Sequence, residues 1–280
     1  MRRAPALLLL VLLAACGGGS DAPEPGPAAS PFAYDASAPL APHSREIADK
    51  GGVRTYDVTF RSRDGTVTAY LLEPSASAAG PPVVYLHGGG GNRSDLLPVA
   101  VGWVREGGRA LLVDAAPARE AATPAARLAA EHDAEAATVV RVRRAVDYLG
   151  TDRVGLVGWS AGARTGAIVA GVEPRIDAFV LMSGGAVPVD EYAAEAPAAL
   201  RDDVRRLLGE VDPLRWVRSA RPGTIFFQNG TKDEVVPREA LEALVAAAPA
   251  PRVRWYPAAH ALSASAYADG YAWLSAKLSP

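Results

Sequence analysis

The chain has 280 residues, of which 49% are hydrophobic and 21% charged, as in a globular protein with one large core. Its 29 basic and 31 acidic residues give a formal net charge of -2, which provides no basic field for nucleic acid. The only cysteine, Cys16, excludes an intrachain disulfide, and four histidines offer little material for a zinc site. We therefore expect one folded domain, no metal site and no nucleic-acid partner.

The first residues have the form of an export signal. Arg2 and Arg3 precede a twelve-residue apolar run, which is shorter than the roughly 20 residues that a transmembrane helix needs. The run ends in the letters LAAC, which close at Cys16 and resemble the lipobox of bacterial lipoproteins. This resemblance predicts a signal peptide over residues 1–15, a lipid on Cys16 and a membrane-anchored location in a bacterial cell envelope. The alternative is an ordinary secretory signal that contains a cysteine.

A flexible linker is predicted over residues 16–45. This segment is rich in Gly, Pro, Ala and Ser and has few large aliphatic side chains, so burial could not offset the entropy of ordering it. We expect it to hold a folded domain, over residues 46–280, away from the membrane that carries the lipid.

From residue 53 onward the sequence alternates between strand and helix patterns. Residues 53–60 and 66–72 alternate apolar and polar side chains, which predicts a leading antiparallel hairpin. Apolar runs predict parallel strands buried on both faces at 82–86, 110–113, 154–157, 178–182, 224–227 and 252–256. Helical patterns occur at 94–106, 124–149, 161–170, 237–247 and 264–277. The prediction is an α/β protein with a mostly parallel central sheet and helices on both faces.

A longer insert, at about residues 184–221, separates two of the predicted strands. One helical face of it carries the apolar side chains of Leu200, Val204, Leu207, Leu208 and Val211. Charged side chains on the other face indicate a solvated surface. We expect a small helical insert. Its apolar stripe would either pack on the body of the domain or form a cap over a pocket.

The sequence GWSAG, residues 158–162, directly follows a predicted strand and precedes a predicted helix. A nucleophile elbow needs this context, because its serine sits on a strained turn and small flanking residues let strand and helix approach. The motif therefore predicts Ser160 as a nucleophile. The alternative is a simple glycine-rich turn.

A second glycine-rich segment, HGGGG from His87, follows the predicted strand 82–86. Glycines in this position leave backbone N–H groups free to point at a developing oxyanion, so Gly88 and Gly89, with the amide of Ala161, form the candidate oxyanion hole. A nucleotide-binding loop does not fit, because the third glycine of G-x-G-x-x-G is missing in either register. A plain turn is the remaining alternative.

The base and the acid follow from chain order, because behind an elbow of this type the acid and then the histidine come after the serine. Of the four histidines only His260 follows Ser160, just past the last predicted strand. Asp233 lies just past another strand, in the letters NGTKDEVVP. We predict a Ser160, Asp233, His260 triad, with Glu234 or a carboxylate of the insert as the alternative acid.

These motifs resemble those of the α/β-hydrolase superfamily, in the branch of dienelactone hydrolases, acetyl-xylan esterases and prolyl-oligopeptidase-like enzymes. The resemblance covers about residues 50–280 and rests on the HGGG loop, the GWSAG elbow, GTKDEVVP and the AAH that precedes the last helix. The chain departs from dienelactone hydrolases in having serine in place of cysteine as the nucleophile.

The resemblance implies an α/β-hydrolase fold and a serine hydrolase that cleaves a small-molecule carboxylic ester through an acyl-enzyme on Ser160, without a cofactor. Two other hypotheses remain open. One is an amidase or peptidase with the same triad, and the other is a catalytically silent envelope lipoprotein that uses its pocket for binding. The motifs specify neither the acyl and alcohol parts of the substrate nor the oligomeric state.

Overall fold

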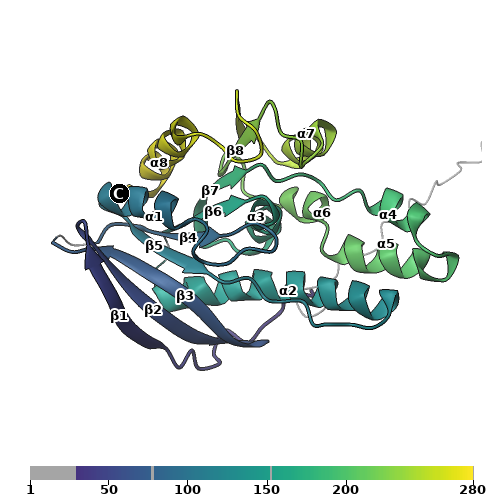
Figure 1. Ribbon diagram of the computed structural model, residues 1–280, viewed down its shortest axis with the longest axis horizontal. Coiled ribbons are helices and arrows are strands. Elements are labelled where there is room, and N and C mark those ends of the chain that lie inside the picture. The colour runs from purple at the N-terminus through teal and green to yellow at the C-terminus, as the bar shows by residue number, and fades with distance from the viewer. Residues whose placement is uncertain (1–29, 77–78, 152, 280) are drawn as a thin grey trace, which may run out of the picture. The chain divides into compact units, whose positions relative to one another are not determined.

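A twisted sheet forms the centre of the fold (Figure 1). The computed structural model describes residues 30–76, 79–151 and 153–279, and in these residues nine strands pair in the order β1-β2-β3-β5-β4-β6-β7-β8-β9. The strands are β1 (His43–Lys50), β2 (Val53–Ser62), β3 (Gly65–Pro74), β4 (Pro82–Leu86), β5 (Arg109–Val113), β6 (Val154–Trp159), β7 (Ile176–Met182), β8 (Ile225–Gly230) and β9 (Arg252–Tyr256). The first three strands and the β3-β5 pair are antiparallel, and the rest of the sheet is parallel.

Helices cover both faces of the sheet, because each parallel strand is connected to the next by a crossover. They are α1 (Leu97–Arg105), α2 (Pro124–Leu149), α3 (Ala161–Val172), α4 (Val189–Glu195), α5 (Arg201–Glu210), α6 (Pro213–Val217), α7 (Arg238–Ala247) and α8 (Ala264–Leu278), with a short 3₁₀ turn at Ala198–Leu200. Apolar side chains of α1 and α8 pack on one face, and those of α2, α3 and α7 pack on the other. The predicted architecture of a mostly parallel sheet with a leading antiparallel part is confirmed.

The insert between β7 and β8 contains α4, α5 and α6 and extends from one end of the sheet (Figure 1). Val204 and Leu208 of α5 line a cavity, together with residues of α2 and α3. The apolar stripe of the insert does both of the things that the pattern left open, since Val211 joins the core on the body and Val204 and Leu208 line a pocket.

The expected linker is wrong for residues 31–45, which belong to the folded unit that begins at Pro31. Phe32 is fully buried and packs edge-on against Trp216, with ring centroids 5.0 Å apart. Arg144 donates hydrogen bonds to the carbonyls of Ala36 and Ala38, and residues from His43 form β1. Aromatic side chains supply the apolar area that aliphatic residues lack here, and the arginine satisfies the carbonyls.

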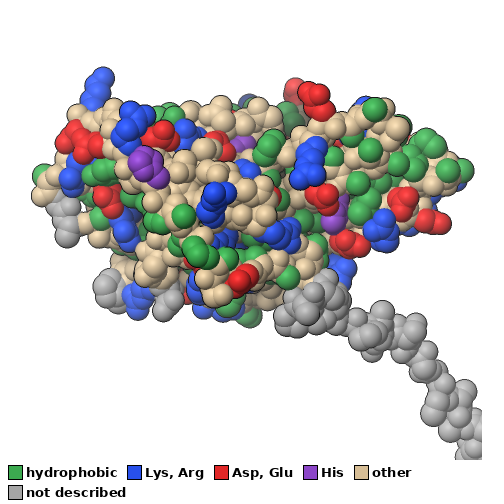
Figure 2. Space-filling model, turned by 90° about the horizontal axis from the view of Figure 1, so that it is seen from below, with side chains coloured by type: hydrophobic (Ala, Val, Ile, Leu, Met, Phe, Trp, Pro, Cys, Tyr) green, Lys and Arg blue, Asp and Glu red, His purple; other side chains and the backbone are tan. Residues whose placement is uncertain are grey.

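The other predictions for the N-terminal region, a signal peptide over 1–15, a lipid on Cys16 and a linker up to residue 29, lie outside the described residues. In the part of the chain that the structure describes, no helix is both long and apolar enough to cross a bilayer. On the face shown in Figure 2, acidic and basic side chains are interspersed.

Candidate active site

The sharp turn between β6 and α3 places Ser160 at the carboxyl end of the sheet. Its φ of 55° and ψ of -116° lie in a region that L-residues rarely adopt, so the turn is strained. A Cβ at Gly158 would overlap with the backbone of Gly162, and one at Gly162 would overlap with the carbonyl of Leu86. Glycine is therefore required on both sides of the serine.

The structure brings the three predicted side chains together. His260 Nε2 lies 2.9 Å from Ser160 Oγ, and His260 Nδ1 lies 2.9 Å from Asp233 Oδ2 and 3.1 Å from Oδ1. This connected arrangement allows His260 to accept a proton from the serine while the carboxylate fixes the orientation of the ring.

Asp233, and not the alternative Glu234, contacts the histidine. The carboxylate of Asp233 is 1% exposed, and its Oδ1 accepts hydrogen bonds from the amides of Val235 and Val236 at 2.9 and 3.0 Å. These two amides hold the carboxylate in place as it faces the imidazole. Glu234 is exposed to solvent.

The loop that carries His260 is tied to its neighbours. The carbonyl of His260 accepts hydrogen bonds from Trp159 Nε1 at 3.2 Å and from Ser183 Oγ at 2.9 Å. The amides of Thr231 and Lys232, in the loop of Asp233, donate to Tyr256 and Ala258. The loops of the acid and the base are thus joined to each other and to the end of β6.

The three predicted oxyanion-hole residues lie around Ser160. A Cβ on Gly88 would be 3.5 Å from the Cβ of Ser160, and one on Gly89 would be 3.6 Å from the Cβ of Ala161. Ala161 is the first residue of α3, so its amide has no carbonyl partner within the helix. The three residues therefore offer backbone donors near the serine, as an oxyanion hole requires.

Buried His87 orients the glycine-rich loop of the candidate oxyanion hole, and the sequence pattern did not indicate this role. Its Nε2 accepts a 3.1 Å hydrogen bond from the amide of Ala115, so the proton must be on Nδ1, which donates to the carbonyl of Gly88 at 2.7 Å. Because a peptide carbonyl and the following amide point in opposite directions, this bond also fixes the direction of the Gly89 amide.

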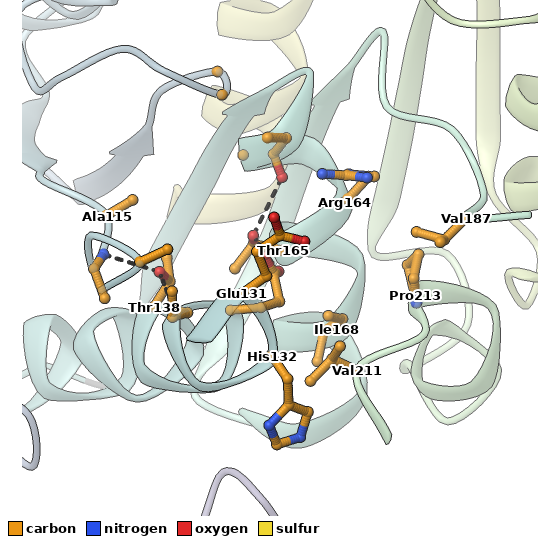
Figure 3. A pocket seen from close by; sticks show the side chains of 18 of the residues that line it. Ala115, Glu131, His132, Thr138, Arg164, Thr165, Ile168, Val187, Val211 and Pro213 are labelled. Atoms are coloured by element: carbon orange, nitrogen blue, oxygen red, sulfur yellow. Dashed lines mark hydrogen bonds between the residues drawn. The ribbon is translucent and has the colours of Figure 1, made fainter. Parts of the chain in front are cut away.

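A cavity of about 830 Å³ begins at the oxyanion loop and continues under the insert. Arg164 and Glu131 are among the side chains that line it in Figure 3, with Thr138 toward Ala115. Most of its other walls are apolar. Among the described residues no three His, Cys, Asp or Glu side chains are grouped as a metal site would require.

Glu135 is a carboxyl group inside this cavity. Thr165 Oγ1 donates a 2.6 Å hydrogen bond to its Oε1. Burial raises the pKa of Glu135 above its ordinary value, while the Thr165 hydrogen bond and the charge of Arg164 act in the opposite direction with smaller effect.

Comparison with solved structures identifies the fold. An acetyl xylan esterase from Paenibacillus sp. R4 superposes with a TM-score of 0.74 at 16% identity, covering 86% of this chain and 90% of that one. Acetyl xylan esterase 1 from Thermoanaerobacterium sp. JW/SL YS485 gives 0.71 at 16% identity, with coverages of 86% and 89%. The chain has the α/β-hydrolase fold.

A cold-adapted esterase from an Arctic intertidal metagenomic library shares this fold with a TM-score of 0.62 at 19% identity, covering 82% of this chain and 97% of that one. No protein-family model matches the sequence, and no curated protein matches it. The likeness is therefore one of α/β-hydrolase architecture.

Proposed function

We propose that the protein is a serine hydrolase that cleaves carboxylic esters through an acyl-enzyme on Ser160. One observation carries this proposal: the unbroken chain of contacts from Asp233 through His260 to a serine on a strained turn. A binding protein has no need of this arrangement. A serine hydrolase needs each part of it.

In the proposed reaction His260 Nε2 removes the hydroxyl proton as Ser160 Oγ attacks the ester carbonyl carbon. Asp233 holds the imidazole in the required tautomer and stabilises its cation. The amide of Ala161 and one from Gly88 or Gly89 donate to the oxyanion, and His260 then protonates the departing alcohol. Water repeats the attack on the acyl-enzyme and releases the acid.

Esters are favoured over amides as substrates by the fold comparison, because several of the solved structures that superpose on this chain are described as esterases. The mechanism uses only side chains and backbone amides of this chain. We therefore propose that no metal or organic cofactor takes part.

A rate assay of the purified protein distinguishes an esterase from an amidase and from a binding protein. The substrates are p-nitrophenyl acetate, p-nitrophenyl butyrate and an aminoacyl p-nitroanilide. We expect ester hydrolysis, and in Ser160→Ala a loss in kcat of about 10⁴ or more. Exposed Ser219 provides a matched control, since Ser219→Ala should keep full activity. Anilide cleavage without ester preference would favour an amidase, and absence of both activities would favour a binding protein.

We also propose that the protein is anchored to a membrane of a bacterial envelope by a lipid on Cys16. Support comes from the order of the first residues alone: two arginines, a short apolar run and LAAC, followed by three glycines and a serine.

A further inference from the structure

The cavity under the insert lies on a defined side of Ser160. It is lined by Gly88, Gly89 and Ala161, and by no residue of the Asp233 loop (231–236) or the His260 loop (257–263). If the protein is the proposed serine hydrolase, the leaving oxygen must reach His260 Nε2 to receive its proton. The alcohol part therefore lies on the His260 side, and the acyl part extends into the cavity.

The size and walls of the cavity suit an acyl group much larger than acetyl. Its volume is about 830 Å³. Apolar side chains from α3 and the insert form much of its surface: Ile168, Val187, Val204, Leu208, Val211 and Pro213. The methylene groups of an acyl chain that enters from the glycine-rich loop would leave water and contact these apolar walls, which favours binding.

An aliphatic acyl group would offer neither a hydrogen-bond acceptor nor a negative charge to Arg164. This arginine lies on α3, its amide bonds to the carbonyl of Ser160, and its guanidinium lines the cavity without a hydrogen bond or ion pair to any residue that the structure describes. The two threonines of the lining are hydrogen-bonded to the protein. Thr138 bonds to Ala116 and Ala134, and Thr165 bonds to Glu135.

The two acidic residues that line the cavity with Arg164 do not form an ion pair with its guanidinium. Glu131 is exposed, so water screens its charge. Glu135 interacts with Arg164 electrostatically but forms no ion pair with it, and burial raises the pKa of this carboxyl. A guanidinium cannot lose its charge in a protein, so half-buried Arg164 keeps a positive charge that forms no hydrogen bond or ion pair with a described residue.

We propose that the cavity is the acyl subsite and that Arg164 selects acyl groups that end in a carboxylate. An aliphatic chain that filled the cavity would bury the guanidinium unpaired, which is costly. A terminal carboxylate would form a charge-assisted hydrogen bond with it. The substrate class is thus a monoester of a dicarboxylic acid.

The selection of a terminal carboxylate by Arg164 is tested with two p-nitrophenyl esters that have six-carbon acyl groups, the adipate monoester and the hexanoate. The p-nitrophenyl acetate ester serves as a short reference. We expect kcat/KM for the adipate to exceed that for the hexanoate by roughly 10- to 100-fold, as one charge-assisted bond allows. Arg164→Gln should abolish this preference, and Arg164→Lys should retain part of it. Arg127→Gln, which removes an exposed arginine of α2 outside the cavity, should leave the preference unchanged.

Acetate hydrolysis separates this inference from the proposed function. An acetyl group carries no terminal carboxylate for Arg164 to bind, so we expect Arg164→Gln to keep acetate hydrolysis. Hydrolysis of acetate without preference for the adipate would overturn the subsite alone, as would equal loss on all three esters in Arg164→Gln. Preference for the ester of 6-aminohexanoate would assign the cavity to cations and also overturn it. No hydrolysis of any ester would overturn the proposed function.

Discussion

Ser183 donates a hydrogen bond of 2.9 Å from its Oγ to the backbone carbonyl of His260, 77 residues further along the chain. Ser183 directly follows β7, is completely buried, and has a φ of 52°, which a non-glycine residue rarely adopts. Its amide is bound to the carbonyl of Gln228. The residue is thus fixed on both sides and supports the loop that carries the candidate base.

Ser183 should act as a positioning residue. We expect Ser183→Ala to lower kcat for ester hydrolysis by about tenfold with little change in KM, since the hydroxyl acts through His260 and one neutral hydrogen bond contributes about 1 kcal/mol.

Ser183→Gly separates the hydroxyl from the strained backbone. Glycine adopts a φ of 52° without strain, so this variant should unfold at a higher temperature than Ser183→Ala. Both variants should lose kcat equally if the hydroxyl is the cause. Wild-type kcat in both, with altered melting temperatures only, would reduce Ser183 to a structural role.

The carboxylate that orients His260 is tested by two adjacent substitutions. Asp233→Asn should lower kcat by about 10³ to 10⁴, because an amide in this position favours the wrong tautomer of the imidazole. Glu234→Gln, at the exposed neighbour, should change kcat by less than about twofold, as expected for a surface site. Steady-state rates on p-nitrophenyl butyrate measure both, and the opposite ranking would transfer the role to Glu234.

Phe32 should be required for stability. Phe32→Ala removes a buried ring from the core and should lower the free energy of unfolding by about 3 to 5 kcal/mol, measured by urea titration. A chain that begins at His43 should be less stable than one that begins at Ser30, because it also loses the carbonyls that Arg144 binds. Equal stability of the two shortened chains would contradict the packing of residues 31–42.

Glu173 should make stability depend on pH. Burial raises the pKa of this carboxyl, but hydrogen bonds and charges from Arg175 and Arg143 outweigh it and hold the pKa below its ordinary value. A lowered pKa in the folded state stabilises the protein above the unfolded pKa of about 4.3, and the contribution is lost as pH falls through the folded value.

Glu173→Gln should therefore destabilise the fold at pH 7, by about 3 to 5 kcal/mol as for a broken buried pair. The difference from the unchanged protein should shrink below about pH 4, the ordinary range of a glutamate. Urea titrations at the two pH values measure it. A difference that is the same at both would assign the loss to packing rather than to charge.

The proposed anchor predicts that Cys16→Ser abolishes incorporation of labelled palmitate and releases the protein from the membrane pellet. The rate of ester hydrolysis should not change, since Cys16 lies outside the proposed catalytic machinery. Palmitate labelling that persists in the variant would show attachment elsewhere and contradict the lipoprotein hypothesis.

Local patterns predicted most of the sheet. The apolar run 82–86 coincides with β4. The two glycines of GWSAG allow the close backbone approach that the strained turn at the serine requires. Asp233 and His260 could be placed because each directly follows a strand, and carboxyl ends of parallel strands meet at one edge. These residues were accessible to sequence reasoning because short segments determine their geometry.

Long-range contacts could not be predicted in this way. The hydroxyl of Ser183 and the ring of His87 act on partners that only the fold brings near, so no local spacing indicates them. The sequence pattern predicts a linker over residues 31–45 because they have few large aliphatic side chains, although Phe32 and Tyr34 anchor them. The cavity beside Arg164 exists only because the insert packs over α2 and α3.

Covalent trapping tests the proposed nucleophile most directly. A fluorophosphonate reacts with a serine only where a neighbouring base and an oxyanion hole activate it. Intact-mass and peptide analysis of the treated protein should show one adduct, on Ser160, with parallel loss of ester hydrolysis and no adduct in Ser160→Ala. An adduct on another residue, or undiminished hydrolysis in a protein fully modified at Ser160, would contradict the account.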